Sequence, residues 1–306
     1  MLELVRRRLM TALPTLAAIV ILSFVLMRIA PGGPFDGERA IDPQTRAALM
    51  AAYGLDRPLP EQIGLYLLRL AHGDFGPSLV YRDFTVTDLI ARGLPISMTL
   101  GGCALVLALV LGTGGGVIAA SRAGRTIDHA LMLIATILTA VPSFVTGPLL
   151  ALVFALWAGW LPVSGWGDGD PSHMILPVIA LALPATGAIA KLTRAGLATA
   201  LAQDNVRSAR ARGLRTTTIL IRHALRPALI PVASYLGPAA AGLLTGAVVI
   251  ETIFALPGLG RYFVQGALNR DYPLVLGVVT LYAALIILFN LLADLAYGWL
   301  DPRARG

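Results

Sequence analysis

Residues 197–231 read LATALAQDNVRSARARGLRTTTILIRHALRPALIP, a polar and basic segment in a chain whose other long segments are mostly apolar. A segment with this many charges cannot lie in the hydrocarbon core of a membrane, where charged side chains are costly to bury. It is therefore predicted to lie at the membrane surface, between apolar spans. Its arginines are Arg207, Arg210, Arg212, Arg215, Arg222 and Arg226.

Two short helices that meet at Gly213 are predicted within this segment. The second begins after the hydroxyl cluster at 216–218 and ends at Pro227. Gly213 suits the break, because glycine can adopt a positive φ and lets a partner backbone come close. Apolar residues recur at helical spacing in the first helix, namely Leu197, Leu201, Ala202, Val206 and Ala209.

The spacing around Gly213 resembles the cytoplasmic EAA loop of ATP-binding-cassette importer permeases. In that family the loop starts with Glu-Ala-Ala and has a glycine after a fixed interval. Here Arg207 stands in the Glu position and Ser208 follows it, so the general start is lost. The strings at 206–213 and 222–225 are instead similar to the peptide and nickel branch of the family.

The resemblance implies that residues 197–227 form a cytoplasmic loop that docks a short helix into a groove on a separate ATPase subunit. On charge alone, the alternative is a solvated basic loop that only follows the positive-inside rule. The spacing, together with further matches along the chain, favours docking. The residues implied to couple to the ATPase are Arg207, Ala209, Arg210, Gly213, Leu214, Thr217, Ile219, His223 and Leu225.

The composition indicates an integral membrane protein. Of 306 residues, 57% are hydrophobic and 13% are charged, whereas about a quarter are charged in soluble domains. The net charge of +7 comes mainly from arginines that flank apolar spans, which is typical of membrane topology and argues against a nucleic-acid partner. Cys103 is the single cysteine, so neither an internal disulfide nor a thiol metal site is expected.

Six transmembrane helices are predicted. The apolar run at 9–27 is longer than that of a signal peptide and no clear cleavage site follows it, so it is interpreted as an uncleaved span. Each span is long enough to cross an apolar core of about 30 Å. The others are predicted at about 96–120, 130–158, 174–190, 228–250 and 273–297.

The arginine distribution predicts that both termini are cytoplasmic, with 31–95 as an extracytoplasmic excursion. Within the excursion, helices are predicted from Asp42 to Gly54 and from Pro60 to Gly73. The predicted fold is a single all-α membrane domain, 1–306, that resembles the type I permease fold of these importers.

Further strings resemble the first membrane subunit of oligopeptide permeases, so the likeness covers essentially the whole chain. They lie at 30–39, 53–62 and 72–78, and at 249–277, where 267–272 is specific to the oligopeptide type.

Glycine and proline patterns predict close contacts and kinks within the spans. The pairs Gly112 with Gly116 and Gly242 with Gly246 are spaced for close helix approach. Prolines in three spans predict kinks; they are Pro142, Pro148, Pro177, Pro184, Pro231 and Pro238.

Two other classes of protein fit the sequence less well. An ion-coupled secondary transporter normally has ionisable residues inside its bundle, whereas Arg28, Lys191, Glu251 and Asp294 lie near span ends, where interface anchoring explains them. Pairing of Asp294 inside the bundle stays an alternative. An intramembrane enzyme needs a nucleophile, base or metal set within the spans, and the four histidines fall outside them or at their edges.

The chain is not expected to hydrolyse ATP, because Lys191, its single lysine, is not part of a phosphate-binding Gly-Lys-Ser/Thr loop. The resemblance implies a permease subunit of an oligopeptide importer in the bacterial inner membrane. Its implied partners are a second homologous permease subunit, two ATPase subunits that hold ATP and Mg²⁺, and an extracytoplasmic peptide-binding protein. Dipeptide, glutathione or nickel-chelate substrates stay open as alternatives.

Overall fold

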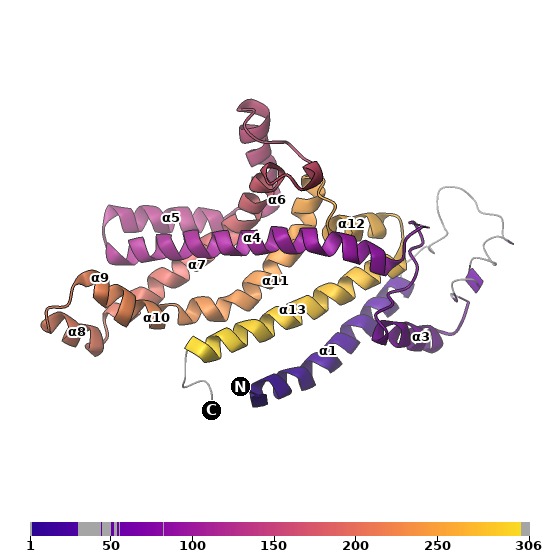
Figure 1. Ribbon diagram of the computed structural model, residues 1–306, viewed down its shortest axis with the longest axis horizontal. Helices are drawn as coiled ribbons and strands as arrows, with labels where there is room; N and C mark the ends of the chain where they lie inside the picture. Colours follow the sequence, from indigo (N-terminus) through magenta and orange to yellow (C-terminus); the bar gives the residue numbers. More distant parts are fainter. Residues whose placement is uncertain are drawn as a thin grey trace.

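The computed structural model describes residues 2–29, 44, 50–51, 54, 56–81 and 83–300. Their regular elements are helices that pack into an elongated bundle (Figure 1). In chain order these are α1 Leu2–Ile29, α3 Leu59–Ala71, α4 Val86–Ser121, α5 Thr126–Ala140, α6 Ser143–Leu150, η1 Ala151–Trp157, η2 Gly167–Gly169, α7 Ser172–Leu201, α8 Asp204–Ala211, α9 Thr216–Thr218, η3 Ile219–Ala224, α10 Leu225–Ala228, α11 Ile230–Ile253, α12 Leu259–Leu268 and α13 Tyr272–Leu300.

The predicted six-span architecture is confirmed, with one correction to its shape. Five helices, α1, α4, α7, α11 and α13, are long and apolar enough to cross a membrane. The sixth candidate is α5 with the helix Ser143–Trp157, which are bent by 102° rather than forming one straight span. Val141 is extended because it precedes Pro142. Pro148 lies just before the π-helix η1 and has no N–H for a helical hydrogen bond.

The start of the second predicted span and the end of the fourth differ most from the prediction. α4 begins at Val86 because Thr85 and Asp88 form a capping box, in which each side chain accepts the backbone N–H of the other residue. α7 continues to Leu201. Leu197 and Leu201 therefore belong to this long helix and not to the first short helix of the basic loop.

Close approaches to α7 organise the centre of the bundle. A Cβ atom at Gly116 of α4 would lie 2.6 Å from the Ala190 carbonyl oxygen, so the predicted close contact at Gly112 and Gly116 is confirmed. For the second predicted pair, Gly246 packs on Leu181 of α7, whereas Gly242 faces open space. The largest apolar core lies between α4, α7 and α11 and includes Leu100, Leu176, Ile189, Leu243, Ile250 and Phe254.

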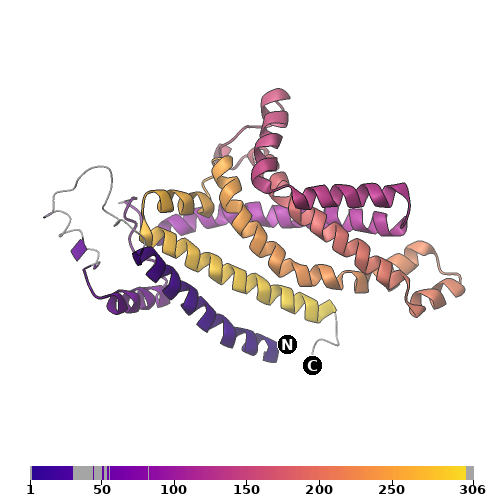
Figure 2. The same cartoon turned by 180° about the vertical axis from the view of Figure 1, so that it is seen from behind.

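The two ends of the bundle differ. The start of α1 and the end of α13 lie towards the end that carries α8, α9 and α10, whereas α3 and α12 lie at the other end (Figure 1 and Figure 2). This arrangement is consistent with both termini and the basic loop on the same side of a membrane. The helix predicted after Pro60 is α3, and Gly73 follows it with a φ of +75°. The helix predicted at 42–54 falls almost wholly outside the described residues.

Candidate functional site

The basic loop folds around its own small core. Val206 and Ala209 lie on the buried face of α8 and pack with Ile219 from the next helix. Arg207 and Arg210 lie on the exposed face of α8, as the helical spacing dictates. Arg207 forms an exposed pair with Asp204 at 3.6 Å, which contributes little to stability. The loop therefore presents an arginine-rich face from a packed support.

Gly213 ends α8 in the conformation that the sequence predicted. Its φ is +77°. The Gly213 N–H donates to the Arg210 carbonyl at 2.9 Å, and the Leu214 N–H donates to the Ala209 carbonyl at 3.3 Å. These two bonds form a Schellman motif, which favours glycine at this position. No atom of the described chain lies within 4 Å of a Cβ built on Gly213, so the requirement for glycine comes from φ.

The second helix of the loop is longer than predicted and changes pitch. It runs through α9, the π-helix η3 and α10, and reaches Leu229 before α11 begins. The helix ends at Ala228, one residue after the end predicted at Pro227. Pro227 lies in the first α-helical turn after the π segment, where a residue without an N–H is tolerated.

The structure separates the predicted coupling residues into three groups by their exposure. Ala209 and Ile219 are buried in the loop's own core, so a direct contact between these side chains and a partner does not fit this conformation. His223 and Leu225 are half-buried. The exposed residues are Arg207, Arg210, Gly213, Leu214 and Thr217.

One exposed apolar residue of the loop escaped the sequence analysis. Ile221 is 67% exposed on η3. Its position two residues after buried Ile219 places it on the opposite face of a helix, which is the signal that could have identified it. Leu214 is also exposed, at 41%. The loop thus combines exposed arginines with two exposed apolar side chains.

The second helix of the loop is attached to the centre of the bundle. Ala224 and Ala228 pack against Leu197 of α7 and Ala120 of α4. A Cβ at Gly196 would lie 2.5 Å from the Ala228 carbonyl oxygen, so the backbones of α7 and α10 are in direct contact. A force on this helix would therefore reach α7 and α4.

Polar contacts near this end join α5 to α7. The Arg194 guanidinium pairs with buried Asp128 at 2.8 Å, and the same carboxylate accepts the Gly124 N–H. Lys191 donates to Thr139 of α5 at 2.8 Å. Lys191 was predicted to anchor the chain at the membrane interface. In the structure it instead connects α7 to α5 through this hydrogen bond.

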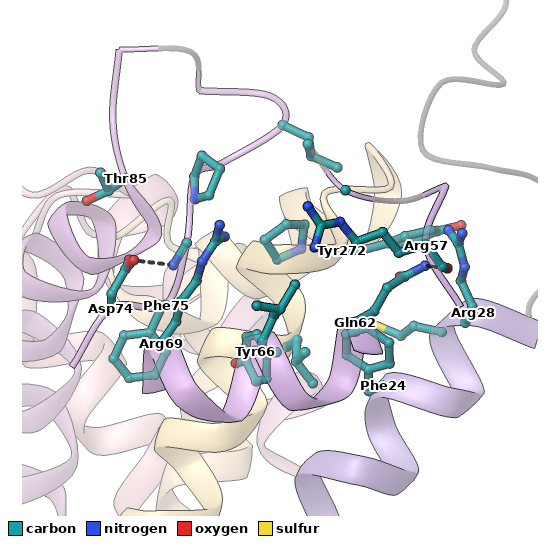
Figure 3. Close-up of a pocket in the computed structure, with 18 of the residues that line it drawn as sticks. Phe24, Arg28, Arg57, Gln62, Tyr66, Arg69, Asp74, Phe75, Thr85 and Tyr272 are labelled. Carbon is teal, nitrogen blue, oxygen red and sulfur yellow. Dashed lines mark hydrogen bonds between the residues drawn. The ribbon is translucent and has the colours of Figure 1, made fainter. Parts of the chain in front are cut away.

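A cavity of about 530 Å³ lies at the other end of the bundle, between α1, α3, α13 and the segment before α4 (Figure 3). Aromatic side chains and three arginines line it; those labelled in the figure include Phe24, Tyr66, Phe75, Tyr272, Arg28, Arg57 and Arg69. Arg57 also pairs with Glu61 at 2.7 Å. This lining combines apolar walls with three arginines and the carboxylate of Asp74. No local sequence pattern predicts this cavity, because its walls come from distant segments.

Two acidic residues expected at span ends have partners on other helices. Glu251 is fully buried and accepts hydrogen bonds from Ser97 of α4 and the Gly260 N–H of α12. The interpretation of Glu251 as an interface anchor is therefore wrong. Asp294 of α13 pairs with Arg8 of α1 at 2.8 Å, and the Arg8 side chain is 55% exposed, so this pair lies at the surface and not inside the bundle.

Known sequences that are similar to this chain are membrane components of transport systems. Residues 112–306 match the profile of a family described as "Binding-protein-dependent transport system inner membrane component". The chain is 48% identical over 305 residues to the oligopeptide transport system permease protein OppB of Salmonella typhimurium, with 100% of both chains covered. It is 42% identical to the dipeptide transport system permease protein DppB of Bacillus subtilis, covering 95% of this chain and 94% of that protein.

Solved structures share the fold at lower sequence identity. An inward-facing structure of the MetNI methionine ABC transporter matches with a TM-score of 0.55 at 19% identity, over 70% of this chain and 96% of that chain. A crystal structure of an amino acid ABC transporter with histidines matches with a TM-score of 0.54 at 18% identity, over 69% of this chain and 94% of that chain. These likenesses bear on the fold alone.

Proposed function

The chain belongs to the family of binding-protein-dependent transport system inner membrane components and is a permease subunit of an ATP-binding-cassette oligopeptide importer, and we propose how its basic loop drives transport. ATP is hydrolysed on separate ATPase subunits. Their closure pushes on the loop around Gly213, and the helices convert that motion into alternating access. The observation that carries the proposal is the exposed arginine face of α8 on a loop whose second helix packs directly on α7.

The exposed residues of the loop define the partner surface that would receive it. Arg207 and Arg210 would bind acidic side chains on the partner, because arginine pairs with carboxylates through several directed hydrogen bonds. Leu214 and Ile221 would pack on an apolar patch next to those acidic side chains. We therefore propose a groove on the ATPase with an acidic rim and an apolar floor. Buried Ala209 and Ile219 support the docked shape from inside.

The remaining partners follow from the family. A second homologous permease subunit would form the pathway together with this chain, and an extracytoplasmic peptide-binding protein would deliver the substrate. Oligopeptides are favoured over dipeptides because the relatives named for oligopeptide transport are more similar to this chain than the relatives named for dipeptide transport. A glutathione or nickel-chelate substrate is the weaker alternative.

Uptake by the assembled complex is expected to require ATP and to be unaffected by collapse of the proton gradient at constant ATP. The physical reason is that the acidic residues described here within the spans are engaged structurally: Glu251 by hydrogen bonds, Asp128 by Arg194 and Asp294 by Arg8. The measurement is uptake of a labelled oligopeptide into proteoliposomes that contain the permease subunits, the ATPases and the binding protein. Uptake of the same peptide driven by a proton gradient without ATP would contradict the proposal.

Two controls make this experiment specific. A complex whose ATPase carries a substitution in its phosphate-binding lysine should bind the peptide-loaded binding protein but accumulate nothing. Competition by unlabelled dipeptide, glutathione and nickel chelate separates the substrate alternatives, and the oligopeptide should compete most strongly.

A further inference from the structure

A buried carboxylate joins three helices at the end of the bundle opposite the basic loop. Glu251 lies in the last turn of α11 and is fully buried. Its Oε1 accepts a hydrogen bond from the Ser97 hydroxyl of α4 at 2.6 Å, and its Oε2 accepts the Gly260 N–H of α12 at 2.7 Å. The Ser97 oxygen in turn accepts the Leu259 N–H at 2.9 Å. One side chain thus connects α4, α11 and α12.

Glycines in the backbone around this carboxylate leave the space that it occupies. A Cβ atom at Gly258 would overlap the Glu251 carboxyl group, although the φ of Gly258 is −92°. Glycine is therefore required there by space and not by backbone conformation. A Cβ at Gly93 of α4 would lie 3.0 Å from the Leu259 nitrogen, and one at Gly260 would overlap Val248. These three glycines let the start of α12 lie directly against α4, α11 and the carboxylate.

The same end of α11 is also held from the other side. The Gly165 N–H donates to the Phe254 carbonyl at 2.8 Å, which fixes the segment between η1 and α7 to the end of α11. Phe254 is itself buried, and Gly147 of α6 packs against its ring. The end of α11 is thus a junction where hydrogen bonds replace water for every polar group named here.

Separating α12 from this junction would remove one donor from the buried carboxylate and loosen the other. The Gly260 N–H comes from α12, and the Ser97 hydroxyl is held in place partly by the Leu259 N–H of the same helix. A buried carboxylate that loses such bonds carries a large desolvation penalty. An independent swing of α12 is therefore strongly opposed, whereas a movement that carries α4, α11 and α12 together keeps every bond.

We propose that Glu251 is a positioning residue of the transport cycle, which keeps α12 fixed on α4 and α11 so that this end of the pathway opens at the boundary of the three-helix unit. The proposal rests on the function proposed above and assigns a task to a residue outside the coupling loop. It excludes one way of opening, in which α12 acts as a flap hinged at residues 254–258.

The test measures the distance between spin labels on α4 and α12 in the assembled transporter. Labels are placed at Ala91→Cys and Leu268→Cys, both exposed, in a Cys103→Ser background. With Glu251 intact, the distance distribution should be narrow and the same with and without ATP. With Glu251→Gln the distribution should broaden, and ATP-driven uptake should fall about tenfold, the effect expected when a hydrogen bond to a charged group is weakened.

Two further variants disturb the same junction while Glu251 stays in place. Ser97→Ala removes one donor, and Gly258→Ala puts a methyl group where the carboxylate lies. Both should broaden the same distance distribution even if the Glu251→Gln complex assembles poorly. Asp168→Asn, at an exposed carboxylate of η2, is the matched control and should change neither readout.

Two results would overturn the proposal. One is a distance that changes with ATP while Glu251 is intact, because α12 would then move separately. The other is a narrow distribution with full uptake in all three junction variants. Failure of the proposed function looks different: the complex with native Glu251 would show no ATP-dependent uptake, while the label distances would still report whether the junction is rigid.

Discussion

Gly116→Val is expected to separate α4 from α7 and to destabilise the folded bundle by about 3 kcal/mol, the upper end of the usual range for overpacking. The upper end applies because the new side chain would meet the Ala190 carbonyl oxygen and the Thr193 side chain. A backbone carbonyl cannot move aside without shifting α7. The measurement is the stability of the purified chain to thermal or denaturant unfolding, together with its yield in membranes.

Gly115→Val is the matched control for this change. The same substitution is made one residue earlier on the same helix, where no other part of the described chain lies within 4 Å of a Cβ. The control should insert and unfold like the native chain. Equal stability of the two variants would mean that the contact between α4 and α7 is not the close one described here.

Gly213→Val is expected to leave the spans folded while weakening attachment of the ATPase. Valine at a φ of +77° costs about 1–3 kcal/mol, and this cost falls on the loop conformation that ends α8. If the ATPase binds that conformation, its docking constant drops roughly 5- to 150-fold. The measurement is the amount of ATPase that co-purifies with the permease, with peptide uptake as a second readout.

The chain contains a close control for backbone strain. Gly124 also has a φ of +77° with open space around it, and it lies in the turn between α4 and α5. Gly124→Val should therefore impose a similar strain without changing ATPase recovery. Full recovery of ATPase and full uptake with Gly213→Val would show that the loop acts only as a basic topology signal.

Features set by local sequence were predicted well. Long apolar runs identified the spans, because few other structures tolerate them. The turn at Gly213 and the helix between Pro60 and Gly73 were also found, since glycine at helix ends has a local conformational cause. These features depend on a few adjacent residues.

Features set by tertiary contacts were not predictable in this way. The 102° bend after α5 needs both Pro142 and a neighbouring bundle on which α6 can pack. Glu251 was taken as an interface residue because its partner Ser97 is far away in the sequence. Ala209 and Ile219 were assigned to a partner surface because a docking motif does not separate residues that contact the partner from residues that support the loop.

The central claim, that the exposed face of α8 contacts the ATPase, is tested most directly by photo-crosslinking in the assembled transporter. A photo-reactive amino acid replaces exposed Arg210, and a second complex carries it at Asp168, an exposed residue in the segment between η1 and α7. The account predicts a crosslink from position 210 to the ATPase subunit, identified by mass spectrometry, and none from position 168. Absence of the ATPase crosslink at position 210, or its formation from position 168, would contradict the account.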